Sequence, residues 1–508
     1  FGQLSVHAWA VGLGIVSGFI SAGYSKLIEL TIRVLWEDLP GAILPADTTI
    51  GPLYILAVVT TAALVIGLLA TVLPATGNMD EWIDLLHTKG VYPSNRLPAQ
   101  LLLAFLTTSA GFSVGPEAPL IIAGAIMGSA VARYCEQPPE VARILNLCGA
   151  AGCLSGFFGL PLVGALFVLE LPHKLGLQYY EALSPAMVSS IVAAIVAKTV
   201  NRKEFGGEYD YPQVDSRAPA GLAWLPILVG LCGAGAALLS VLLVKGAKKV
   251  TIGVKHKIED ATGKAWIGPL VVKLAMGALV GILGMLYPQT LFWGELNLQS
   301  PLDGQRTPLY VIGNTPMVSW AVVDAGREIT ASGALQVACF KVLAIVLSIA
   351  GAFPGGCIFP FFYAGAYFGR ALGLLGGPLE RHMALVTVCA MASVQACVTK
   401  TPLASSLLVL VTAGSFGAGQ QQVAGVVLPL IIIAVYTGCL ACHPTGVAYS
   451  LQQRDRGGLA GAPGDPPRSC RGREERPLAR ERRLAGPEPP PLRRQHRSRR
   501  RGCHRGLR

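Results

Sequence analysis

The chain has 508 residues, of which 52% are hydrophobic and only 14% carry a charge. Soluble domains average about 25% charged residues, so this composition excludes an ordinary soluble globular protein and indicates a membrane protein. The formal net charge of +12 does not belong to the apolar part, because the residues from Arg454 onward hold 17 Arg and 6 Asp or Glu and account for +11 of it.

Apolar segments follow one another from the start of the chain to about residue 441. The run at 6–20 resembles the core of a secretory signal, but we expect a first membrane helix there because further apolar segments follow it. About 20 apolar residues span the bilayer core, and the stretches at 53–73 and 218–244 hold no charged residue. In chain order, the predicted helical segments are 6–34, 53–73, 98–112, 117–134, 140–156, 161–171, 178–199, 218–248, 267–287, 334–352, 360–375, 383–399, 402–416 and 424–441.

Several of these segments are too short to cross a bilayer, and many begin or end at Gly or Pro. Short, interrupted segments are typical of discontinuous helices in transporters and channels. Such breaks persist at membrane depth only where they line a cavity or are buried in protein. We therefore predict one all-α, multi-pass membrane domain at 1–452, with many tilted and discontinuous helices. The polar stretches at 200–217 and 296–330 are expected outside the bilayer.

The residues at 453–508 are rich in Arg and Pro and show no apolar periodicity, so we expect a disordered tail. The positive-inside rule favours a cytoplasmic position for this tail. Binding of the tail to anionic lipid or to nucleic acid is the alternative. We expect the lipid bilayer, and no nucleic acid, as a partner of the protein.

An internal repeat relates two halves of the membrane domain, at about 1–215 and 216–452. GPEAPLIIAGAIMGSA from Gly115 and GCIFPFFYAGAYFGRA from Gly356 share seven of sixteen positions at an offset of 241 residues, and the same offset aligns PLVGALFVL with PLASSLLVL. Two matches at one offset indicate a duplicated half, with chance similarity between Gly- and Ala-rich segments as the alternative. A duplicated half predicts a binding site where the halves meet.

One acid, Glu117, interrupts the first copy of the repeat between Pro116 and Pro119. Both copies place Gly and then Pro at the start of an apolar helix, where unpaired backbone N–H groups and the helix dipole form an anion site. Two such helix starts could converge on one anion. The Glu117 carboxylate would then compete with that anion and leave when it is protonated or swings aside. The alternative is a Glu that lies near the membrane interface and reaches water.

These stretches resemble the motifs of the CLC family of chloride channels and proton-coupled chloride transporters. GPEAP resembles the family motif that carries the gating glutamate, which places Glu117 in that role. GGCIFP, with Gly356, Phe359 and Pro360, resembles the motif whose backbone holds the central anion. By this resemblance the anion-binding groups are Thr76 in PATGNMDE, the backbone N–H groups of Cys357 and Ile358, and Tyr449 in VAYS. Gly77 belongs to the supporting motif around Thr76.

The resemblance further implies a CLC-like inverted repeat and a homodimer with one pathway in each subunit. It implies chloride or a similar small anion as the transported ion, no cofactor and no enzymatic activity. The chain departs from the family pattern where Pro116 replaces a basic residue and Ala118 replaces a Gly. These departures affect the selectivity among halides and nitrate that the resemblance would otherwise imply.

A further departure bears on the mechanism of transport. In PLVGALFVLELPH, the resemblance places Glu170 at the family's first acid and Leu171 at the position of its proton-transfer glutamate. Because Leu cannot relay a proton, we expect a passive, glutamate-gated chloride channel. The alternative is a chloride/proton antiporter, since some exchangers also lack this acid. Glu170 is expected to cap a neighbouring helix or to meet His173 or Lys174.

Two other kinds of site are weaker interpretations. GFSVG fits the Gly-x-Ser-x-Gly pattern of serine hydrolases, with Ser113 as nucleophile and His443 as its base, but that motif needs a strand before the serine and an apolar helix is predicted there. Cys439 and Cys442 form the closest pair among the cysteines of the apolar part. Without a second pair, they favour helix packing over a metal or redox site, and we expect no bound metal.

Overall fold

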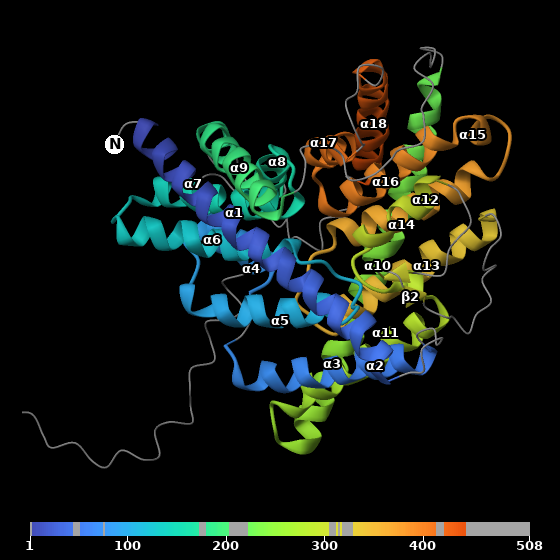
Figure 1. Cartoon of the computed structure of the whole chain (residues 1–508), viewed down its shortest axis with the longest axis horizontal. Helices are drawn as coiled ribbons and strands as arrows, with labels where there is room; N and C mark the ends of the chain where they lie inside the picture. The colour runs from blue at the N-terminus through green and yellow to red at the C-terminus, as the bar shows by residue number, and fades with distance from the viewer. Residues whose placement is uncertain are drawn as a thin grey trace, which may run out of the picture. The chain divides into compact units, whose positions relative to one another are not determined.

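The computed structural model describes residues 3–43, 51–74, 77–171, 179–202, 222–303, 311–312, 315–316, 329–412 and 421–442 (Figure 1). Within these residues the chain is helical apart from one hairpin, in which β1 (Val311–Ile312) pairs antiparallel with β2 (Thr315–Pro316). The predicted all-α fold is therefore confirmed. The predicted tail at 453–508 lies outside the described residues, and the division into a membrane domain and a tail stays a prediction.

The first half contributes nine α-helices within the described residues, and its short helices start at recognisable capping residues. The Asn78 side chain caps α4 by accepting a hydrogen bond of 2.8 Å from the Glu81 N–H. Pro52 and Pro139 occupy the first turns of α3 and α7, where a missing N–H costs nothing. The elements are α1 (Gln3–Arg33), the π-helix η1 (Val34–Asp38), α2 (Leu39–Ile43), α3 (Pro52–Val72), α4 (Met79–Thr88), η2 (Ser94–Arg96), α5 (Leu97–Ser109), α6 (Glu117–Tyr134), α7 (Pro139–Phe158), α8 (Val163–Glu170) and α9 (Tyr179–Asn201).

The second half begins with α10, whose 39 residues exceed what a bilayer core requires. Thr330 caps α13 by accepting a hydrogen bond of 3.1 Å from the Gly333 N–H. The elements are α10 (Trp224–Thr262), α11 (Ile267–Leu286), η4 (Pro288–Thr290), η5 (Glu295–Asn297), α12 (Gln299–Asp303), α13 (Ala331–Ala350), α14 (Ile358–Gly373), α15 (Pro378–Arg381), α16 (Met383–Thr399), α17 (Pro402–Thr412) and α18 (Gln421–Cys442).

Helix lengths agree with a multi-pass membrane protein that has discontinuous helices. The described residues include seven helical segments that are long and apolar enough to cross a membrane. Others, such as α8 with 8 residues and α17 with 11, are too short to span the bilayer core alone. These two short helices pack against each other, one from each half (Figure 1).

Every predicted segment overlaps a helix. The predictions were wrong mainly in the polar stretches of the sequence, where helices were missed or ended too early. The helix α4 was not predicted, because it contains no apolar run. The helix α10 continues to Thr262, beyond the predicted end at 248. The stretch at 296–330, predicted as a loop, contains most of η5, the helix α12 and the hairpin of β1 and β2.

The repeat predicted at an offset of 241 residues extends over five pairs of helices. The helices α6 and α14 start at Glu117 and Ile358, and α7 and α16 end at Phe158 and Thr399. The helices α5 and α13 end at Ser109 and Ala350. Each of these three pairs of residues is 241 positions apart. The pairs α8 with α17 and α9 with α18 have bounds that agree with the same offset within two residues.

The two halves meet through residues that contact their own repeat equivalents. Gly115 and Gly356 form an antiparallel bridge, in which the Gly115 N–H donates to the Gly356 carbonyl at 2.9 Å and the Gly356 N–H donates to the Gly115 carbonyl at 2.5 Å. The rings of Phe112 and Phe353, also 241 positions apart, have centroids 4.0 Å from each other. Reciprocal contact between equivalent residues is the signature of a two-fold relation, so the axis between the halves passes through this junction.

Candidate functional site

The carboxylate of Glu117 lies at this junction between the halves. Glu117 is the first residue of α6 and is fully buried. Its Oε1 accepts a hydrogen bond of 3.3 Å from the N–H of Phe359, in the first turn of α14. A carboxylate from the first half thus lies at the helix N-terminus of the second half, where free N–H groups and the helix dipole favour a negative charge.

Glu117 is bound by backbone groups rather than by a charged side chain in the described part of the chain. Its second oxygen, Oε2, has no hydrogen-bond partner among the described residues. None of the ion pairs in the described part of the chain includes this carboxylate. Glu117 is therefore held by helix N-termini and backbone N–H groups, and one of its two oxygens still has acceptor capacity.

Glycine is required at the bridge because the carboxylate lies against the backbone there. A Cβ atom placed on Gly356 would overlap Oε2 of Glu117 and would lie 2.9 Å from the N atom of Ala118. A Cβ on Gly115 would also overlap the carboxylate. The two glycines that anchor the repeat motifs therefore let two backbones and one carboxylate share the space at the junction.

An aromatic wall lies next to the carboxylate. Phe359 is 4% exposed, and its ring meets that of Phe158, at the end of α7, with centroids 5.4 Å apart. The Phe362 ring is also near that of Phe359, with centroids 6.1 Å apart. Because Glu117 is fully buried beside these apolar rings, its electrostatic interactions with the helix N-termini are stronger than they would be in water.

The structure brings together most of the residues that the sequence singled out. Gly115, Pro116 and Pro119 surround the start of α6, and Gly356, Cys357, Ile358, Phe359 and Pro360 form the start of α14. Gly77 lies against the hydroxyl of Tyr92, in the turn before α4. Thr76 and Tyr449 lie outside the described residues, so their predicted role as anion ligands stays a prediction.

Two buried lysines bind backbone carbonyls outside the helices' own hydrogen bonds, and neither lysine was singled out from the sequence. The Lys273 ammonium donates to the carbonyls of Gly351 at 3.1 Å and Ala352 at 2.5 Å and lies 4.9 Å from the Phe353 ring centroid. The Lys341 ammonium donates to the carbonyls of Thr290, Leu291 and Phe292 at 3.1, 3.3 and 2.6 Å. A single Lys inside each predicted apolar segment was the signal that could have revealed them.

Glu170 repeats the arrangement of Glu117 at a second contact between the halves. Its two carboxylate oxygens accept hydrogen bonds from the N–H groups of Leu403 at 3.0 Å and Ala404 at 2.9 Å, at the start of α17. The prediction that Glu170 caps a neighbouring helix is confirmed. His173 and Lys174 lie outside the described residues. Leu171 follows it as a buried residue with 2% exposure.

The geometry around Ser113 does not support a serine hydrolase. The helix α5, rather than a strand, precedes Ser113. The Ser113 hydroxyl is buried without a hydrogen-bond partner in the described part of the chain, and its backbone N–H donates to the Ser348 hydroxyl at 3.2 Å. His443, the predicted base, lies outside the described residues, so the evidence against the hydrolase is the helix that replaces the required strand.

The sequence model of the voltage gated chloride channel family matches residues 62–438. The chain belongs to this CLC family. One curated member, the voltage-gated ClC-type chloride channel ClcB of Escherichia coli, is 23% identical over 444 residues, which cover 85% of this chain and 95% of the relative. Another, the chloride channel protein CLC-e of Arabidopsis thaliana, is 25% identical over 371 residues, which cover 71% of this chain and 48% of the relative.

Solved CLC structures share the fold. A slow cyanobacterial Cl−/H+ antiporter superposes with a TM-score of 0.68 at 16% identity, over 89% of this chain and 98% of the other. A CLC-type fluoride/proton antiporter superposes with a TM-score of 0.63 at 17% identity, over 88% of this chain and 98% of the other. The chain is therefore a CLC-type anion transport protein of the membrane, with the family's two-half helical fold.

Proposed function

We propose that the protein exchanges chloride, or a similar small anion, for protons at the junction between its two halves. The observation that carries this proposal is the fully buried carboxylate of Glu117 at the N-terminus of α14, with one oxygen hydrogen-bonded and the other without a partner among the described residues. A carboxylate in that position occupies the place of an anion. Protonation is the reaction that would vacate it.

Exchange would follow because the Glu117 carboxylate and the transported anion compete for the N-terminus of α14. While Glu117 is ionised, its Oε1 holds the N–H of Phe359. When Glu117 takes up a proton, it loses its attraction to the dipole of α14, and a chloride ion can take its place on the backbone N–H groups. Departure of the anion and return of the ionised carboxylate release the proton. The two antiporters named above support this mode of transport, because they share the fold.

A passive channel is the second candidate function. The specific observation that favours it is Leu171, a buried apolar side chain at the position of the family's proton-transfer glutamate. The name of the Escherichia coli relative, a chloride channel, agrees with it. The solved neighbours fit exchange better, and exchange would then require water rather than a side chain to carry the proton past Leu171.

Reconstituted vesicles distinguish the two functions. With a chloride gradient and no initial pH gradient, we expect chloride movement to drive protons uphill, measured with a pH-sensitive dye inside the vesicles. A protonophore should collapse the proton gradient, and vesicles without protein should show neither flux. Chloride flux without proton movement would exclude exchange and establish the channel.

Thr76 and Tyr449 are proposed to bind the anion through their hydroxyl groups. A hydrogen bond to a charged group contributes about 1.5–3 kcal/mol, so Thr76→Val and Tyr449→Phe should each weaken chloride binding by roughly one to two powers of ten. Titration calorimetry with chloride in detergent measures the change. Unchanged affinity in both variants would remove these two residues from the site.

The assembly and orientation follow the family resemblance. We propose a homodimer with a separate pathway in each subunit, embedded in the lipid bilayer, with the Arg-rich tail on the cytoplasmic side. The positive-inside rule supports that orientation, since 17 Arg lie beyond residue 453.

A further inference from the structure

Three cysteines that are separated in the sequence meet between α16 and α18. Cys397, on α16, and Cys442, on α18, belong to one buried cluster, and Cys439 packs against it three positions before Cys442 on the same face of α18. The Cys397 sulfur lies so close to α18 that a Cβ atom placed on Gly438 would be 2.8 Å from it. The Cys442 thiol also donates to the Ala234 carbonyl at 3.5 Å. From the sequence, Cys439 and Cys442 were predicted to be packing residues. Cys397 adds a third thiol, and we call the three residues the thiol cluster.

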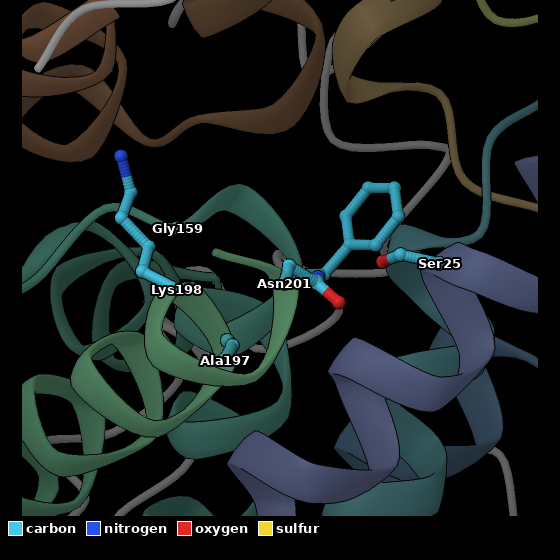
Figure 2. A pocket seen from close by; sticks show the side chains of 7 residues that line it. Ser25, Gly159, Ala197, Lys198 and Asn201 are labelled. Atoms are coloured by element: carbon cyan, nitrogen blue, oxygen red, sulfur yellow. The ribbon is translucent and has the colours of Figure 1, made fainter. Parts of the chain in front are cut away.

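The repeat gives the thiol cluster a counterpart in the first half. A small cavity lies between α1 and the C-terminal ends of α7 and α9 (Figure 2), and it is lined by Ser25, Gly156, Phe157, Gly159, Ala197, Lys198 and Asn201. The residues 241 positions after Gly156, Lys198 and Asn201 are Cys397, Cys439 and Cys442. At these three equivalent positions, the first half has a Gly, a Lys and an Asn beside a cavity, and the second half has three cysteines.

Each half has a lysine at this place, but the two lysines come from non-equivalent positions. In the first half, Lys198 lies over Gly159, so that a Cβ placed on this glycine would be 2.7 Å from its Cε atom. In the second half, the equivalent of Gly159 is Lys400, whose ammonium donates to the Cys439 carbonyl at 3.4 Å. Both Gly159 and Lys400 end their helices with a positive φ, of 64° and 60°. The thiol cluster therefore has an ammonium neighbour, the kind of group on which cysteine reactivity depends.

We propose that the thiol cluster is a redox site, in which Cys397 forms a disulfide with Cys439 or Cys442, and that this disulfide slows anion transport. Three thiols could in principle bind a soft metal, but the described residues contain no group of three or more potential ligands in an arrangement that could hold one. One thiol on α16 facing two on α18 suits disulfide formation, with the third thiol able to exchange.

The oxidant that suits this site is hydrogen peroxide, a small uncharged molecule. Cys439 is the half-exposed member of the cluster, whereas Cys397 and Cys442 are buried. Peroxide converts the Cys439 thiol to a sulfenic acid and leaves as water. The sulfur of Cys397 then attacks the Cys439 sulfur, loses its proton and expels the oxygen as a second water. One peroxide and two thiols thus give one disulfide and two waters.

The disulfide would act on transport through both helices that it joins. The helix α16 leads through Lys400 into α17, whose first N–H groups are bound by Glu170 of the other half. The helix α18 ends at Cys442, seven residues before Tyr449, the proposed anion ligand. A covalent bond between α16 and α18 would restrict both segments, so this effect on transport depends on the proposed function.

The test combines mapping of the disulfide with a transport assay. Purified protein is treated with hydrogen peroxide, free thiols are alkylated, and cross-linked peptides are identified by mass spectrometry. We expect a peptide pair that joins Cys397 to Cys439 or Cys442, and severalfold slower chloride efflux from vesicles, restored by dithiothreitol. Cys397→Ala should abolish both effects. Cys339→Ala, which removes an exposed thiol on α13, is the matched control and should change neither.

The outcomes separate the site from the transport mechanism. Absence of the Cys397 cross-link, or a stoichiometric metal in the purified protein, would overturn the redox site. A cross-link with unchanged efflux would overturn its regulatory effect. Mapping needs no transport, so a failure of the proposed exchange mechanism would leave the mapping result intact. Cys397→Ala should fold, since the equivalent residue is Gly156; if it does not, Cys439→Ala and Cys442→Ala should each remove one of the two possible cross-links.

Discussion

Replacement of Gly128 by valine should abolish the folded protein. Gly128 lies where α6 crosses α7, and a Cβ atom on it would overlap the carbonyl oxygen of Leu145. Gly124 and Gly149 meet at the same crossing, each without room for a Cβ against the backbone of the other. Small residues allow such close approach of membrane helices. Since the obstruction is backbone, no side chain can move aside, and the two helices must separate.

The cost of that separation should exceed the cost of ordinary overpacking, because backbone rather than side chains must move. Overpacking a core costs about 1–3 kcal/mol even where side chains can adjust, and a native domain is stable by only about 5–15 kcal/mol. Because α6 carries Glu117 at its first residue, the displacement would also move the site. We expect Gly128→Val to give aggregated protein in size-exclusion chromatography and no chloride flux.

A second variant, at the repeat equivalent of Gly128, and a control on α10 complete this test. Gly369, the equivalent of Gly128, lies where α14 crosses α16, and a Cβ there would be 2.7 Å from the Thr387 Cα atom. Gly369→Val should therefore also damage the fold, although its overlap is smaller than that of Gly128→Val. On α10, a Cβ added to Gly235 would meet no atom of the described residues within 4 Å, so Gly235→Ala should be tolerated. A monodisperse, active Gly128→Val protein would disprove the close crossing.

Much of the helical fold could be predicted because apolar runs and one repeat specify it. The match between GPEAP and GGCIFP set the offset of 241 residues, and that offset holds for the ends of α7 and α16. The helix α4 was missed because its sequence, MDEWIDLLHT, has charges every few residues, although the Asn78 cap and the acids of its first turn mark its start. The charged second part of α10 was missed for the same reason.

Only those parts of the site that short stretches of sequence specify could be predicted. A lone acid between prolines pointed to Glu117, and the repeat pointed to the helix start that receives it. The partners of Lys273 and Lys341 could not be predicted, since their ammonium groups bind carbonyls of irregular backbone up to 79 positions away in the sequence. The thiol cluster was not predicted because Cys397 lies 42 positions before Cys439 in the chain, so only the packing of α16 against α18 brings the two residues together.

Replacement of Glu117 by glutamine should have the second large effect, on transport rather than on folding. In the wild type, acidification should raise chloride flux, since a protonated Glu117 no longer competes for the N-terminus of α14. A glutamine has nearly the same size but neither charge nor proton to exchange. Glu117→Gln should therefore give chloride flux that is independent of pH and no longer drives protons, measured in the same vesicles.

Glu170→Gln is the matched control, because Glu170 is also a first-half carboxylate bound at a second-half helix N-terminus. It accepts N–H groups of Leu403 and Ala404 with both oxygens, whereas Oε2 of Glu117 has no partner in the described part of the chain. Glu170 therefore serves as a fixed cap, and its glutamine variant should lose about 1–3 kcal/mol of stability while it keeps the pH dependence of the wild type. The contrast between the two variants separates a carboxylate that moves from one that only holds the halves together. If Glu117→Gln kept the pH response, or if Glu170→Gln lost it, the assignment of Glu117 as the group that exchanges with the anion would be wrong.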